Sequence, residues 1–221
     1  MTVRSVIMNA MDAAPTKRRR RKQARPAELL AAALDTFREK GFAATRMEDI
    51  AARAGVSKGT IYLYYPSKQA VFEALVRENL LPSLARLEAI RQSTEGSCAD
   101  RLRRFVASLA TTAGEPRLFA IPKLILAEAG NFPELARFYR HEVVARGLAL
   151  VSALLEEGMA RGEFRRLDPD LAARLFIGPV ILTALWQSAF AAVEDAPTPP
   201  PVLLDLHLDI FLRGIAAEPA R

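Results

Sequence analysis

Two short helical patterns joined by a tight turn, over residues 45–64, most constrain what this chain can fold into. Thr45 and Glu48 have the spacing of a capping box, in which each side chain accepts a hydrogen bond from the other residue's backbone N–H. Apolar residues then recur at helical spacing until Gly55, where a residue without Cβ most easily adopts a left-handed backbone. Ser57 can cap a second helix that starts directly after it. Two short helices around such a turn predict a helix-turn-helix, whose second helix enters the major groove of DNA.

Positive charge is concentrated at the same end of the chain. Residues 1–68 contain 14 Lys and Arg against 6 Asp and Glu, whereas residues 69–221 contain 17 against 19. Cationic side chains that neutralise phosphates release counterions, which gives affinity for DNA of any sequence. We expect residues 1–22, with the run KRRRRK, to be a disordered basic arm. The arm either enters a minor groove or attracts DNA non-specifically; a nuclear localisation signal is disfavoured because the remaining sequence is bacterial in character.

The rest of the chain is also helical in pattern, and we find no strand signal. Pro82 and Pro122 predict a kink or an interruption in the helices that contain them. The fold class is therefore all-α with about nine helices: residues 23–83 form a DNA-binding domain, with the helix-turn-helix at about 46–65, and residues 84–221 form a second helical domain. The expected helices span about 26–40, 46–54, 58–64, 67–91, 98–113, 116–129, 133–161, 169–193 and 202–216.

Several other classes of protein are disfavoured. No uninterrupted apolar run is long enough for a transmembrane helix, and no apolar stretch follows the basic run as in a secretory signal. The single cysteine, Cys98, fits a reducing cytoplasm; an oxidant sensor there would need a lowered thiol pKa, and an inert thiol is the favoured interpretation. His141 and His207 lack partners at ligand spacing, and no catalytic or phosphate-binding motif is present. We expect no enzyme activity, no metal site and no cofactor.

The segment TRMEDIAARAGVSKGTIYLYYPSK resembles the DNA-binding domain of the TetR/AcrR transcriptional regulators. The resemblance extends from about Arg25 to Leu75, and beyond it only the helix order and size are similar. It rests on the I-A-x-x-A-G-V-S turn, the G-T-x-Y of the second helix, the Tyr-Tyr pair and the Lys three residues further on. Tyr65 stands where the family often has Phe, and we expect it to face the domain core with Ile61 and Val56.

The resemblance implies which residues contact a DNA duplex. Thr45 and Arg46 are expected to hold a phosphate at a helix N-terminus, and Lys68 to make one strong phosphate contact. Gly59 would let the backbone approach the bases, and Ser57 is interpreted mainly as a helix cap. The remaining side chains would reach base edges, phosphates or thymine methyl groups. The predicted DNA-binding residues are Thr45, Arg46, Ser57, Lys58, Gly59, Thr60, Tyr62, Tyr64 and Lys68.

The resemblance also implies an effector pocket in the second domain and a homodimer formed by the last two helices. The apolar run of residues 169–193 and the series Leu203, Leu206 and Ile210 are the expected dimer surfaces. The scarcity of charge among the pocket candidates favours a small hydrophobic effector, although ordinary core packing is the alternative for each of them. The candidates are Phe105, Leu109, Phe119, Leu124, Phe138, Phe176 and Trp186.

These expectations describe a cytoplasmic bacterial transcriptional regulator that does not enter a membrane. A homodimer would bind a palindromic operator, most simply as a repressor. An effector would release it by selecting a different subunit arrangement, with the helix of residues 67–91 pivoting near Pro82. One alternative is a DNA-binding protein without effector response, which binds all DNA alike with a steep salt dependence. Another is an enzyme with a helical domain, which the lack of a catalytic cluster disfavours.

Overall fold

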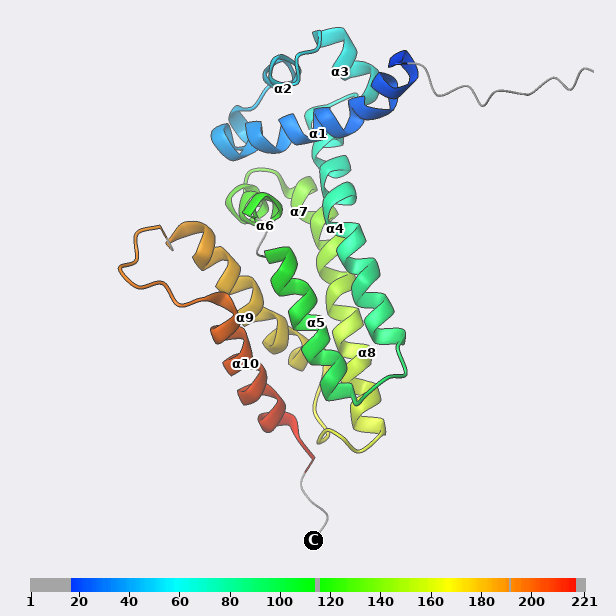
Figure 1. Cartoon of the computed structure of the whole chain (residues 1–221), viewed down its shortest axis with the longest axis vertical. Helices are drawn as coiled ribbons and strands as arrows, with labels where there is room; N and C mark the ends of the chain where they lie inside the picture. Colours follow the sequence, from blue (N-terminus) through cyan, green and yellow to red (C-terminus); the bar gives the residue numbers. More distant parts are fainter. Residues whose placement is uncertain (1–16, 114–115, 191, 218–221) are drawn as a thin grey trace, which may run out of the picture.

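The computed structural model describes residues 17–113, 116–190 and 192–217, which are helical along most of their length (Figure 1). The rod formed by α7, η1 and α8 is uninterrupted, so the described chain has nine helical rods. Its described residues contain no strand beyond an isolated antiparallel bridge between Phe164 and Ala216. The all-α prediction with about nine helices is confirmed. The elements are α1 (Lys17–Ala44), α2 (Met47–Arg53), α3 (Lys58–Tyr64), α4 (Lys68–Gln92), α5 (Cys98–Ala113), α6 (Pro116–Glu128), α7 (Pro133–Tyr139), the π-helix η1 (Arg140–Ala145), α8 (Arg146–Ala160), α9 (Pro169–Ala189) and α10 (Pro200–Ile215).

Helix α1 starts earlier than the sequence pattern predicts. Residues 17–22 are helical, whereas we expected them to be part of a disordered arm; residues 1–16 of that arm lie outside the described residues. The expected start at Pro26 relied on the preference of proline for the first helical position. Here Pro26 lies inside α1, because the Lys, Arg, Gln and Ala residues before it are good helix formers. At the other end, Gly41 has φ 75° and ψ 169° and terminates the regular helix, as expected.

Helices α1–α3 form a head at one end of the molecule, and α4 runs from the head towards the opposite end (Figure 1). The head is organised around a cluster of buried residues that we call the head cluster, which includes Ile50, Ile61 and Phe72. The same cluster contains Ile121 of α6 and Leu135 of α7. Along α4 the head cluster ends at Leu80, close to the predicted domain boundary, but α6 and α7 of the predicted second domain also contribute to the core of the head.

A second group of buried residues, the body cluster, fills the lower bundle. It is formed by the second half of α4 together with α5, α8, α9 and α10, which run alongside one another below the head (Figure 1). Its largest fully buried side chains include Leu102, Phe105 and Phe176.

The prolines inside the long helices do not interrupt them. Helix α4 continues past Pro82 to Gln92, and α6 continues past Pro122, where an interruption was expected. Each proline removes one backbone hydrogen bond. Around Pro82 this loss is offset by packing, because Leu80 and Leu84 are both buried.

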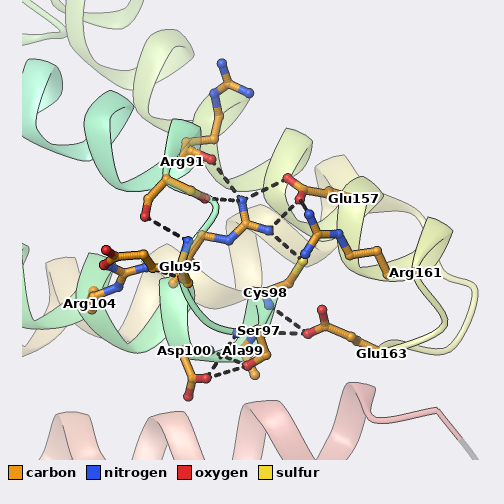
Figure 2. A network of polar contacts seen from close by, with 12 residues as sticks. Arg91, Glu95, Ser97, Cys98, Ala99, Asp100, Arg104, Glu157, Arg161 and Glu163 are labelled. Carbon is orange, nitrogen blue, oxygen red and sulfur yellow. Dashed lines mark hydrogen bonds and ion pairs between the residues drawn. The ribbon is translucent and has the colours of Figure 1, made fainter.

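A polar network ties the connection between α4 and α5 to α8 (Figure 2). The guanidinium of Arg101, only 2% exposed, donates to the carbonyls of Arg91 (2.9 Å) and Ser93 (3.1 Å) and to the carboxylate of Glu157 (2.5 and 3.0 Å). It also donates to Sγ of Cys98 at 3.0 Å. Burial raises the pKa of the Cys98 thiol, which favours the inert interpretation over an oxidant sensor.

Candidate nucleic-acid interface

A tight turn after α2 sets the angle between the two helices of the motif. Gly55 has φ 64°, a left-handed conformation that glycine adopts without steric cost. The N–H of Val56 donates to the carbonyl of Ala51 at 2.9 Å, and the N–H of Gly55 donates to that of Ala52 at 3.1 Å. This pair of bonds is a Schellman motif. The predicted helix stop at Gly55 therefore has the expected physical basis.

The start of α2 differs from the predicted capping box. Arg46 is the N-cap residue, and its backbone N–H donates to Oδ2 of Asp49 at 3.0 Å. Thr45 is 1% exposed, and its hydroxyl donates to the carbonyl of Gly41 at 2.6 Å. The prediction from Thr45 and Glu48 is wrong by one residue. Glu48 and Asp49 are adjacent, so a capping box can start at either Thr45 or Arg46, and threonine is the commoner N-cap residue of the two. The Thr45 side chain is also not exposed to a phosphate.

The side chain of Lys68 binds backbone carbonyls at the end of α1. Its Nζ donates to the carbonyls of Phe42 (2.5 Å), Ala43 (3.0 Å) and Thr45 (2.8 Å), and it lies 4.5 Å from the centre of the Phe42 ring. All three ammonium donors are occupied, which disfavours the predicted phosphate contact. From α6, Oε1 of Glu128 accepts the N–H groups of Phe42 (3.0 Å) and Ala43 (3.1 Å). Helices α4 and α6 thus hold the same stretch, residues 41–46, which we call the α1–α2 connection.

The orientation of α3 follows from one buried residue. Ile61 is fully buried in the head cluster, and successive helical residues are rotated by about 100°, so Gly59 and Leu63 lie on the opposite side. Leu63 is 84% exposed and Tyr62 is 42% exposed. Tyr64 is partly buried and packs against the head cluster, so it is less accessible than Tyr62. Leu63 was missing from the predicted contact residues, although its spacing from Ile61 already places it outward.

The remaining polar residues flank this outward side. Ser57 caps α3, since its Oγ accepts the N–H of Thr60 at 3.2 Å; its Oγ also lies 2.9 Å from the Thr60 hydroxyl. Nζ of Lys58 forms an exposed ion pair with Glu48 at 2.6 Å, whose hydrogen bond raises the pKa of Lys58. Exposed ion pairs are weak, so Lys58 can exchange this carboxylate for a phosphate. Arg46 is exposed at the start of α2.

Tyr65 lies where the sequence predicts. It is partly buried and packs against the head cluster, as Val56 does. Burial raises the pKa of its phenol. Its role is therefore in the core of the head.

The predicted pocket residues are divided between the two buried clusters and the surface. Phe105, Leu109 and Phe176 belong to or pack against the body cluster. Leu124 and Phe138 pack against the head cluster. The side chain of Phe119 lies outside the described residues, and Trp186 is exposed, with Nε1 donating to Oε1 of Glu194 at 2.6 Å. A surface pocket of about 460 Å³ lies between the start of α5, the α8–α9 connection and the end of α10, and none of the candidates lines it.

Helices α9 and α10 expose an extended apolar surface, which we call the α9–α10 surface. Its large exposed apolar residues are Leu171, Leu175, Ile181, Leu182, Trp186, Phe190, Val202, Leu203, Leu206 and Ile210. By length and composition alone, Pro169–Gln187 in α9 could also cross a membrane, and 28% of that stretch is buried. Large exposed apolar side chains repeated along two helices are typical of surfaces that another molecule covers.

Comparison with known proteins gives consistent matches along the chain. Residues 29–75 match the family model of bacterial regulatory proteins of the tetR family, and residues 93–197 match that of the tetracyclin repressor-like C-terminal domain. The HTH-type transcriptional regulator RutR of Escherichia coli (strain K12) is 47% identical over 195 residues, which cover 82% of this chain and 79% of RutR.

Solved structures share the fold. FadR from Bacillus subtilis, in complex with stearoyl-CoA, has a TM-score of 0.72 at 24% identity, covering 86% of this chain and 98% of FadR. SmeT, the repressor of the Stenotrophomonas maltophilia multidrug efflux pump SmeDEF, has a TM-score of 0.71 at 24% identity, covering 87% and 91%.

Proposed function

We propose a specific role for this chain, which belongs to the TetR family of bacterial regulatory proteins and is therefore a DNA-binding transcriptional regulator and not an enzyme. In this proposal it is a homodimeric repressor that acts in the cytoplasm. The homodimer binds a palindromic operator, and a small hydrophobic effector releases it. The observation that carries the DNA-binding part is the exposed side of α3. Gly59, Leu63 and Tyr62 face away from the head cluster, and Lys58 and Arg46 are exposed beside them.

DNA binding can be tested with duplexes that the protein itself selects from a random library. Fluorescence anisotropy at about 150 mM salt should give a much lower Kd for the selected duplex than for a random one. Lys58→Ala should weaken binding to both duplexes and reduce the slope of log K against log salt by about 0.9, as expected for one lost phosphate contact. Arg166→Ala is the matched control, since Arg166 is an exposed cation on the α8–α9 connection. Equal binding of selected and random duplexes would refute sequence-specific regulation.

The α9–α10 surface supports the homodimer. On α10, Leu203, Leu206 and Ile210 follow one another at helical spacing and are all exposed. On α9, Leu171, Leu175 and Leu182 do the same. A second copy related by a two-fold axis covers both stripes with the same two stripes. The measurement is sedimentation velocity without detergent: a dimer is expected, and precipitation that only detergent prevents would favour a membrane instead.

The contacts at the α1–α2 connection support release by an effector. Lys68 of α4 and Glu128 of α6 hold this connection from two sides, and Arg46 at its end caps α2. A shift of α6, or of α4 about Pro82, therefore acts on the start of the helix-turn-helix. A hydrophobic effector is favoured because FadR, which shares this fold, was crystallised with stearoyl-CoA.

The second candidate function is an effector-independent DNA-binding protein. It is kept because the predicted pocket residues lie in two different buried clusters and at the surface. Native mass spectrometry of protein purified from its own host separates the two. A copurifying small molecule that releases the selected duplex supports the repressor. A ligand-free protein whose DNA binding no cell extract alters would favour the second function.

A further inference from the structure

We infer that Leu63 reads the sequence of the bound DNA by contacting the methyl group of a thymine. The inference rests on the proposed function and adds to it the base that α3 selects. Leu63 is 84% exposed, more than any other large apolar side chain of the described residues. It is remote in the sequence from the α9–α10 surface and lies on the helix that enters the major groove.

The position of Leu63 on α3 makes it the outermost side chain of the helix. Ile61 points into the head cluster, and Leu63 is rotated from it by about 200°. Tyr62 lies about 100° to one side of Leu63 and is exposed, so it faces a wall of the groove when Leu63 faces its floor; Tyr64, on the other side, packs against the head cluster. Phosphates line the walls of the groove, which suits a phenolic hydroxyl, whereas base edges form the floor.

Gly59 gives a second, independent observation on the same side of α3. It precedes Leu63 by one helical turn, and a Cβ built on it would meet only Oγ of Ser57, at an ordinary 3.9 Å. Its φ is not in the left-handed region. Nothing within the chain therefore requires glycine at this position. Close approach of an outside surface does explain it, because a bare backbone beside Leu63 lets the helix sit deeper in the groove.

Thymine is the base whose major-groove edge suits a leucine. It presents a C5 methyl group there, whereas the edges of the other bases carry hydrogen-bond donors and acceptors without a methyl group. A leucine packed against a purely polar base edge would exclude water from that edge without replacing the hydrogen bonds that the edge makes to water, which is unfavourable. Leu63 therefore favours thymine at the base pair that it faces in each half-site.

The test replaces each thymine of the selected duplex in turn with deoxyuridine, which lacks only the methyl group. For the unchanged protein, one substitution per half-site should raise Kd about fourfold, equivalent to the ~0.8 kcal/mol of one buried methylene-sized group. The same substitution should change Kd of Leu63→Ala by much less than twofold. Leu63→Ala should keep its melting temperature, because Leu63 makes few contacts within the chain.

The matched control is Leu126→Ala, which removes another strongly exposed leucine (61%) from α6 and should keep the full deoxyuridine effect. A flat scan with the unchanged protein would overturn the inference while leaving sequence-specific binding intact. An effect of equal size in Leu63→Ala would also overturn it. If the protein selects no sequence at all, both the inference and the proposed function fail.

Discussion

Replacing Glu128 with alanine should detach the α1–α2 connection from α6. One carboxylate oxygen of Glu128 accepts the N–H of Phe42 at 3.0 Å and that of Ala43 at 3.1 Å. Phe42 is buried and Ala43 is exposed, so water can replace the hydrogen bond to the N–H of Ala43 but only poorly the one to the N–H of Phe42. An unsatisfied, partly buried donor costs about 1–3 kcal/mol, whereas an exchanged surface bond costs much less. We therefore expect the free energy of unfolding to fall by about 2 kcal/mol.

The assay combines urea unfolding with amide hydrogen exchange. In Glu128→Ala, the midpoint should fall and the amides of Phe42 and Ala43 should exchange faster. Glu128→Gln keeps an oxygen acceptor, so it should lose roughly half as much stability. Both variants should bind the selected duplex more weakly, because the connection positions the start of α2. Glu156→Ala, an exposed helical glutamate of α8, is the control and should stay within about 0.5 kcal/mol of the unchanged protein.

Two combinations of results would each refute one part of the reasoning. If the amides of Phe42 and Ala43 stay protected in Glu128→Ala and stability is unchanged, the carboxylate does not hold the connection. If stability falls but DNA affinity does not, the carboxylate holds the connection without positioning the helix-turn-helix.

Three further predictions concern the interface, its support and the dimer. Gly59→Ala should leave the protein at least as stable, because alanine favours helix by about 0.5–1 kcal/mol over glycine and its Cβ meets no clash. Its affinity for the selected duplex should fall, whereas a lower melting temperature would show that Gly59 is needed for the fold. Lys68→Met should destabilise the head and weaken DNA binding without changing the salt slope, whereas a slope reduced by about 0.9 would indicate a direct phosphate contact. Leu206→Glu should sediment as a monomer and lose operator binding; a dimeric variant would contradict the proposed α9–α10 interface.

The helix-turn-helix could be predicted because its signals are local. Gly55 and Ser57 act on backbone groups within a few residues, so their roles follow from spacing alone. The role of Lys68 could not be predicted in this way, because the carbonyls that it binds lie 23 to 26 residues earlier in the chain. Leu63 was not among the predicted contacts, although helical periodicity from Ile61 already places it on the outward side of α3.

The pocket candidates show a further limit of sequence patterns. Periodicity indicates that Leu124 and Phe176 are on buried sides of their helices, and both are at least partly buried. It does not indicate which neighbour each side packs against, and the two residues lie in different clusters. The π-helical turn within the rod of residues 133–160 likewise had no signal in the pattern, because one additional residue per turn barely disturbs it.

The head cluster extends past the predicted domain boundary, and this limits how far the DNA-binding part can be treated as a portable module. A fragment ending at residue 83 would leave Phe72 and its neighbours without Ile121 and Leu135, so those faces would meet water. Heat should accordingly melt the protein in one cooperative step, with no surviving N-terminal intermediate. Grafting this head onto an unrelated sensor would require carrying α6 and α7 along with it.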